Sequence, residues 1–144
     1  MKFAHWARRV RSLVVILGFL TLSLNVVAQQ RFESGPYKGF LKEEPELNKI
    51  ELPDPISVSV VEGTVVYSGT QPLSGAVFEI RASGGRVFSA TTDSGGAFAI
   101  PHVPPGTYAL KVTKNQFHSM IGTALVSRKI SRKKGIHILL QLGT

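Results

Sequence analysis

The second half of the chain alternates apolar and polar residues in short runs, and this pattern does most to limit what the chain can fold into. A period of two places successive side chains on opposite faces of a β-strand. Clusters of Gly, Pro, Asp and Ser separate the runs about every 8–12 residues, a spacing typical of all-β domains. We predict about seven strands, within residues 58–67, 78–82, 87–91, 98–100, 108–112, 117–126 and 136–142.

These runs predict an all-β fold over residues 57–144, in the form of a seven-stranded Greek-key β-sandwich of immunoglobulin size. A domain this small buries only about 60–65% of the surface of its unfolded chain. The sequence contains no cysteine, which excludes disulfides, thiol catalysis and zinc sites built from cysteine. The alternating Phe, Ile, Leu and Val side chains must therefore supply the core on their own.

Residues 1–28 predict a secretory signal peptide. Four basic residues and no acidic one precede an apolar run at residues 13–24, and Val26 and Ala28 are the small residues before a cleavage site. A membrane-spanning helix needs about 20 apolar residues, so the run is short for a span, although an uncleaved membrane anchor stays the alternative. We expect export to the periplasm or the extracellular space of a bacterium.

The net charge of +8 is unevenly distributed along the chain. Removal of residues 1–28 takes away four basic residues and no acidic one, which leaves a net charge of +4. Five basic residues lie within residues 128–134, so the rest of the exported chain carries a net charge of −1. The sequence therefore predicts no broad basic surface for nucleic acid, because the positive charge is local.

Residues 29–56 predict an extended linker between the signal peptide and the sandwich. The segment contains several prolines, and no period of 2 or 3.6 persists across it. The alternative is that Phe40 and Leu41, or Ile50 and Leu52, dock on a neighbouring surface.

Four segments follow one another in order: Val61-Glu-Gly-Thr-Val65, Pro72-Leu-Ser-Gly-Ala-Val77, Thr92-Asp-Ser-Gly-Gly-Ala-Phe98 and Ile100-Pro-His-Val-Pro-Pro-Gly-Thr-Tyr-Ala-Leu-Lys-Val112. Together they resemble the carboxypeptidase regulatory-like domain family. The resemblance covers about residues 58–142 and implies a transthyretin-like (prealbumin-type) seven-stranded sandwich, without implying a particular function. The sequence departs from the family at Gln116, which stands before Phe117 where the family often has glycine.

The turn residues of these motifs have structural explanations. Asp93 can accept hydrogen bonds from backbone amides of its own turn, and Gly95 or Gly96 suits a positive φ. We predict that Phe98, which follows this turn, points into the core.

In the next motif Pro105 fixes its own φ and Gly106 supplies the second turn position. Tyr108 is predicted to bury its ring, so that its hydroxyl needs a hydrogen-bond partner.

No catalytic residue, metal ligand or cofactor-binding residue is predicted. The spacing of the histidines at 102, 118 and 137 matches no zinc motif. The carboxylates fall on different strands and turns with no paired spacing, and no nucleophile motif is present. We predict no cofactor.

The basic segment, Arg128, Lys129, Arg132, Lys133 and Lys134, is the candidate site for an anionic ligand. Its position between the last two predicted strands indicates an exposed connection, which could meet lipid headgroups or acidic glycans. The alternative is a solvated loop that protects the adjoining edge strand from aggregation. No aromatic residues interleave with the basic ones, which argues against nucleic acid.

These observations favour an exported non-catalytic module with a structural or protein-interaction role, whose partner is an unidentified protein or glycan. The first alternative is a module that binds carbohydrate or an anionic surface. Sugar sites need exposed aromatic faces, and only Tyr67 and Phe117 are candidates for such a role. An enzyme of unknown chemistry is the third hypothesis, and contact with a membrane is expected only through an uncleaved signal or the basic segment.

Overall fold

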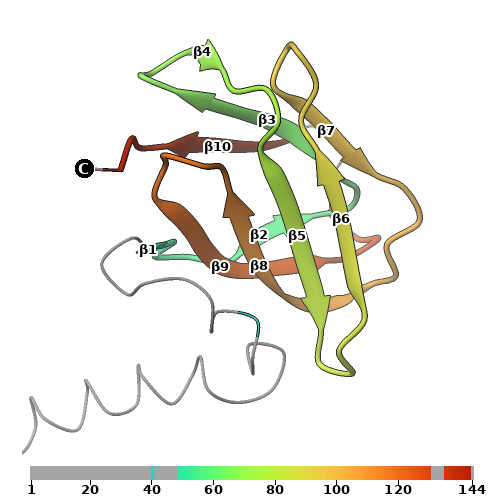
Figure 1. Ribbon diagram of the computed structural model, residues 1–144. Coiled ribbons are helices and arrows are strands. Elements are labelled where there is room, and N and C mark those ends of the chain that lie inside the picture. Colours follow the sequence, from blue (N-terminus) through green and yellow to red (C-terminus); the bar gives the residue numbers. More distant parts are fainter. Residues whose placement is uncertain (1–39, 41–48, 131–134, 144) are drawn as a thin grey trace, which may run out of the picture.

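The computed structural model describes residues 40, 49–130 and 135–143, and the predicted signal peptide and most of the predicted linker lie outside these residues. The described residues form strands arranged in two sheets and contain no helix (Figure 1). The predicted all-β class is confirmed, but the described residues form ten strands where about seven were predicted. The strands are β1 (Lys49–Glu51), β2 (Ile56–Val58), β3 (Val61–Tyr67), β4 (Gln71–Pro72), β5 (Val77–Ala82), β6 (Val87–Thr91), β7 (Ala97–Ile100), β8 (Gly106–Thr113), β9 (Ser119–Val126) and β10 (Ile136–Leu140).

The two sheets differ in size and together make the sandwich. The six-stranded sheet has the order β1-β9-β8-β5-β6, with β2 also paired to β9. The four-stranded sheet has the order β10-β3-β4, with β7 also paired to β3. Two antiparallel hairpins, β5–β6 and β8–β9, supply four adjacent strands of the six-stranded sheet, with β6 at its edge.

The edge of the six-stranded sheet begins earlier in the chain than the boundary predicted at residue 57. Strands β1 and β2 both run parallel to β9, and the Leu52 amide donates to the Ile121 carbonyl at 2.8 Å. Pro53 and Pro55 lie between the two strands, and proline cannot donate to a ladder. The prolines that suggested a linker therefore mark a break within an edge strand.

The first predicted strand, residues 58–67, is two strands in different sheets. A bend at Ser59 and Val60 carries the chain from β2 in one sheet to β3 in the other. Gly63 makes no bulge, because the pairing of β3 with β7 continues through it and the pairing with β10 begins at it. A Cβ at Gly63 would collide with the backbone carbonyl of Ile136, so the glycine allows the close approach of β10.

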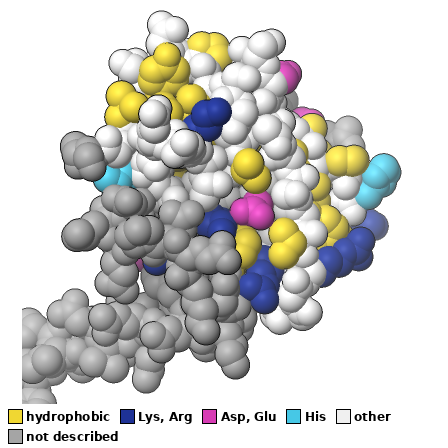
Figure 2. Space-filling view, viewed as in Figure 1, with side chains coloured by type: hydrophobic (Ala, Val, Ile, Leu, Met, Phe, Trp, Pro, Cys, Tyr) yellow, Lys and Arg dark blue, Asp and Glu magenta, His cyan; other side chains and the backbone are white. Residues whose placement is uncertain are grey.

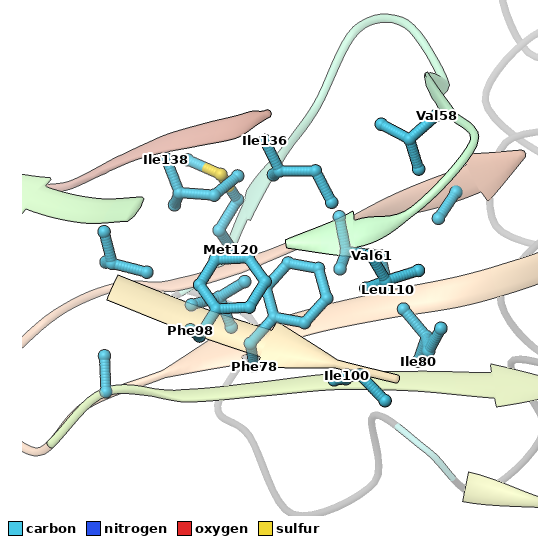
Figure 3. Close-up of a cluster of buried hydrophobic side chains, with 14 of the residues drawn as sticks. Val58, Val61, Phe78, Ile80, Phe98, Ile100, Leu110, Met120, Ile136 and Ile138 are labelled. Atoms are coloured by element: carbon cyan, nitrogen blue, oxygen red, sulfur yellow. The ribbon is translucent and has the colours of Figure 1, made fainter. Parts of the chain in front are cut away.

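The core lies between the sheets and consists of the inward-facing residues of both (Figure 3). The rings of Phe78 and Phe98 stack at its centre, with centroids 4.2 Å apart and planes inclined by 20°. Leu110 is fully buried, as the alternation of β8 predicts. The other buried members of the core include Val61, Val65, Ile80, Ile100, Val112, Met120, Ala124, Ile136, Ile138 and Leu140.

The part of the chain that the structure describes contains no helix long and apolar enough to cross a membrane. The apolar run at residues 13–24 lies outside it.

Candidate functional site

Asp93 organises the turn between β6 and β7. Its Oδ1 accepts hydrogen bonds from the backbone amides of Gly95 and Ala97, each at 2.9 Å. Gly96 has a φ of 73°, and a Cβ there would lie 2.5 Å from the Val65 carbonyl oxygen. The position needs glycine because its backbone is left-handed and because a side chain there would collide with β3.

The connection between β7 and β8 differs from the turn predicted at Pro105 and Gly106. The residue in the left-handed region is His102, with a φ of 59°. Gly106 is the first residue of β8, pairs with Val126 and is not among the positive-φ glycines. The chain therefore turns at His102, before the predicted position, and His102 adopts a left-handed conformation that residues other than glycine rarely take.

Tyr108 joins this connection to the core. Its ring is buried, and its hydroxyl donates to the Pro104 carbonyl at 2.6 Å. Burial raises the pKa of the Tyr108 phenol, and the positive charge of Arg86 opposes that rise. The hydroxyl thus has a structural partner in the backbone.

Gln116, the departure from the family pattern, has a φ of 71°. The turn keeps the left-handed conformation that glycine favours, with a glutamine in its place. The Gln116 carbonyl accepts from the Gly143 amide at 2.8 Å, and the His118 amide donates to the Gln141 carbonyl at 2.8 Å. The end of the chain therefore pairs with this turn.

The histidines serve different parts of the fold. His102 lies in a turn, His118 precedes β9, and His137 lies on β10 with its Nδ1 2.8 Å from the Thr64 hydroxyl. Within residues 40, 49–130 and 135–143 there is no group of three or more His, Asp or Glu side chains that could hold a metal ion.

A small depression lies at the break between β1 and β2. Its volume is about 10 Å³, room for at most one water, whereas ligand pockets measure about 300–1,000 Å³. It is lined by Glu51, Leu52, Pro53, Asp54, Pro55, Gly122 and Thr123.

The basic segment is only partly described. Arg128 and Lys129 are exposed just beyond β9, whereas Arg132, Lys133 and Lys134 lie outside the described residues. The strand registers place the β5–β6 hairpin, which carries Arg86, at the same end of the sandwich. In Figure 2, dark-blue Lys and Arg side chains lie at the lower right of the face in view.

The two candidate sugar-stacking rings pack against each other. The centroids of Tyr67 and Phe117 are 5.7 Å apart and their planes are inclined by 77°. Both rings are half-buried against the core. Because they meet edge to face, they do not form one flat stacking surface.

Phe40, which the sequence analysis did not assign to the sandwich, lies on the outer face of the six-stranded sheet. This is the face turned away from the core. Phe40 is only 8% exposed and packs with Ala109 and Ile121, which are 0% and 4% exposed. The Lys111 ammonium lies 4.8 Å from the centroid of the Phe40 ring.

Lys111 also holds the backbone of Phe40. Its Nζ donates to the Phe40 carbonyl at 3.1 Å and lies 3.7 Å from Oε2 of Glu79. On the neighbouring strand, the Arg81 guanidinium lies 5.8 Å from the centroid of the Phe40 ring. One aromatic residue and its own carbonyl therefore occupy a basic, partly apolar site on β5, β8 and β9.

The sequence contains two weak signals for this site. Phe40 and Leu41 form an isolated apolar pair in a segment without periodicity, and docking was left open as an alternative. The sheet itself offered a second signal, because Ala109 is an apolar residue at an outward position of β8.

Comparison with known families agrees with this fold. A profile of the carboxypeptidase regulatory-like domain family matches residues 60–131, which is half of the chain. The chain belongs to the carboxypeptidase regulatory-like domain family. In this carboxypeptidase regulatory-like domain the matched residues run from the bend before β3 to the segment beyond β9.

Two solved structures are similar to part of the chain. Both are crystal structures of a type II cohesin–X-dockerin complex from Acetivibrio cellulolyticus, with mutations at its N-terminal or C-terminal interface. The identity is 29%, and the TM-scores are 0.45 and 0.43. The match covers 59% of this chain and 58% of the chain it matches, just over half of each. No curated protein sequence matches.

Proposed function

We propose that this carboxypeptidase regulatory-like domain protein is an exported, non-catalytic module that acts by contacting another protein, in a structural or interaction role. The observation that carries the proposal is the family match, which extends over both sheets of the sandwich. The predicted signal peptide at residues 1–28 supports export.

The polar groups that an enzyme could use support a non-catalytic role, because they hold the backbone. Asp93 accepts from the amides of its own turn, and Tyr108 donates to the Pro104 carbonyl. Thr92 donates to the Leu73 carbonyl at 2.6 Å and accepts from the Ala76 amide at 2.9 Å. Substitutions at these residues are expected to change stability rather than a reaction rate.

Export is tested by intact mass and cell fractionation of the protein expressed with its own N-terminus. We expect the exported form to begin at Gln29. A form that keeps residues 1–28 in the membrane fraction would contradict cleavage.

The interaction role is tested by chemical cross-linking in the producing cell, followed by reconstitution of each cross-linked pair from purified proteins. We expect at least one reconstituted pair. A hydrolytic activity that a single His, Asp or Ser substitution abolishes without unfolding the protein would overturn the non-catalytic role.

A second candidate function is binding to an anionic surface, favoured by the exposure of Arg128 and Lys129. Sedimentation with vesicles of anionic lipid, at low and high salt, tests it. Charge-driven binding should weaken as salt rises and should fall in the double variant Arg128→Gln/Lys129→Gln. The matched control, Lys49→Gln on β1, should leave binding unchanged.

A further inference from the structure

We propose that the outer face of the six-stranded sheet is a binding site for a peptide segment that presents an aromatic side chain, and that the chain's own Phe40 occupies this site. The inference rests on the proposed interaction role and names the surface that performs it. A protein partner with an aromatic residue in the same place must then displace Phe40.

The apolar floor of the site indicates that this face is built to be covered. Outward positions of a sheet that faces water are normally polar. Ala109 and Ile121 occupy diagonal outward positions on the paired strands β8 and β9, and Phe40 packs on both. Without Phe40 these two side chains would form an apolar patch between charged neighbours.

Lys111 recognises features that any aromatic residue of a peptide can offer. Its ammonium lies over the ring of Phe40 and donates to the backbone carbonyl of the same residue. Cation–π attraction favours an aromatic ring over an aliphatic side chain of similar size. The carbonyl contact fixes the backbone beside the ring, so the site selects an aromatic side chain without specifying the rest of the sequence.

Arg81 adds an unused donor at the edge of the site. Its Nε is buried, has no hydrogen-bond partner, and belongs to the guanidinium 5.8 Å from the Phe40 ring. A buried donor without a partner is costly. A ligand with a carboxylate beside its aromatic residue would supply the missing acceptor, so we expect acidic aromatic segments to bind more tightly than neutral ones.

Phe40 has an advantage over a free ligand because it belongs to the same chain as the site. In the sequence, eight residues lie between Phe40 and β1. Binding within one chain is an intramolecular step, which raises the effective concentration of the bound segment. A free peptide therefore competes poorly with Phe40 and should bind well only when Phe40 is removed.

The experiment measures binding of a fluorescein-labelled synthetic peptide with the sequence of residues 36–47 to the full chain by fluorescence anisotropy. We expect the Phe40→Ala variant to bind this peptide at least about tenfold more tightly than the wild type does. A peptide with alanine in place of both its aromatic residues, Tyr37 and Phe40, should bind neither protein.

Two protein variants control this measurement. In the Phe40→Ala background, Lys111→Met should weaken peptide binding about tenfold or more. Leu139→Ala, at an exposed position on β10 in the other sheet, should leave it unchanged. If Phe40→Ala disturbs folding, judged by circular dichroism, Phe40→Leu replaces it, because leucine keeps the apolar contact but loses the cation–π contact.

The proposal is overturned if Phe40→Ala does not bind the peptide, or if the wild type binds it equally well. Light scattering should show a monomer that Phe40→Ala leaves unchanged. A dimer that this variant dissociates would mean that Phe40 comes from a second copy. If cross-linked partners bind equally well to the wild type and to Lys111→Met, the interaction role stands and this face is not its site.

Discussion

The two faces of the six-stranded sheet present neighbouring residues of β8 to very different surroundings. Leu110 points inward and is fully buried among side chains of both sheets. Lys111 points outward, where it contacts Glu79 and Phe40. The inner face is covered by an entire second sheet, whereas on the outer face the described part of the chain places Phe40 over Ala109 and Ile121.

We expect the inner face to determine stability and the outer face to determine recognition. Removing an inner side chain leaves a cavity that the surrounding sheets cannot close, because protein interiors are close-packed. Removing an outer side chain opens the surface to water, which can solvate Lys111 and Glu79. We therefore expect inner substitutions to change the free energy of unfolding and outer ones to change mainly what binds.

The largest expected effect compares two phenylalanines. Phe98→Ala should lower the free energy of unfolding by about 3–5 kcal/mol, because its ring stacks on Phe78 in the core. Phe40→Ala should lower it by about 1–2 kcal/mol, because the burial of the ring is partly offset by the entropy cost of ordering its segment. Urea denaturation of both variants checks this, and equal losses would remove the distinction between the faces.

The second comparison uses adjacent residues of one strand. Leu110→Ala should cost about 2–5 kcal/mol of stability as a core truncation. Lys111→Ala should cost about 1 kcal/mol, since it removes one hydrogen bond and a partly exposed ion pair. Thermal and urea unfolding measure both, with Ser89→Ala, exposed on β6, as a control expected to stay within about 0.5 kcal/mol of the wild type. A larger loss for Lys111→Ala would show that the outer contact is part of the folding core.

The third prediction concerns a polar group on the inner face. Tyr108→Phe should cost about 1 kcal/mol at neutral pH, because the Pro104 carbonyl loses its donor. Burial raises the pKa of Tyr108, so its contribution is fully present below the unfolded pKa of about 10 and is lost as the pH rises through the folded value. The wild type should therefore lose stability faster than the variant above about pH 10. Urea midpoints from pH 7 to 11 measure this, and parallel curves would contradict it.

The smallest effect is expected on the outer face. Glu79→Gln removes the charge that lies 3.7 Å from the Lys111 ammonium, with both side chains in contact with solvent. Such pairs contribute about 0–1 kcal/mol, so the change should be at the lower end and should shrink in high salt. Melting temperatures at low and high salt measure it. A loss comparable to that of Leu110→Ala would mean that the pair is structurally essential.

Much of the inner face could be predicted from the sequence, since alternation in β5, β8 and β10 shows which side chains point inward. The strand β9 could only be placed within residues 117–126, because nearly all of its residues are buried and no alternation marks one face. Its outward side is covered near Ile121 by Phe40, a contact between residues far apart in the chain. The positive φ of His102 and of Gln116 could not be predicted either, because residue preferences favour glycine in that conformation.

The sequence by itself determined the all-β class, the family, and the inward side of the regularly alternating strands, because these follow from local periodicity and turn chemistry. Only the tertiary structure decided that residues 49–58 form the edge of the six-stranded sheet and that Phe40 covers its outer face. The physical reason is that short strands interrupted by proline, and single aromatic contacts, have no periodic signal of their own. Their positions depend on the surface that β8 and β9 offer once they have paired.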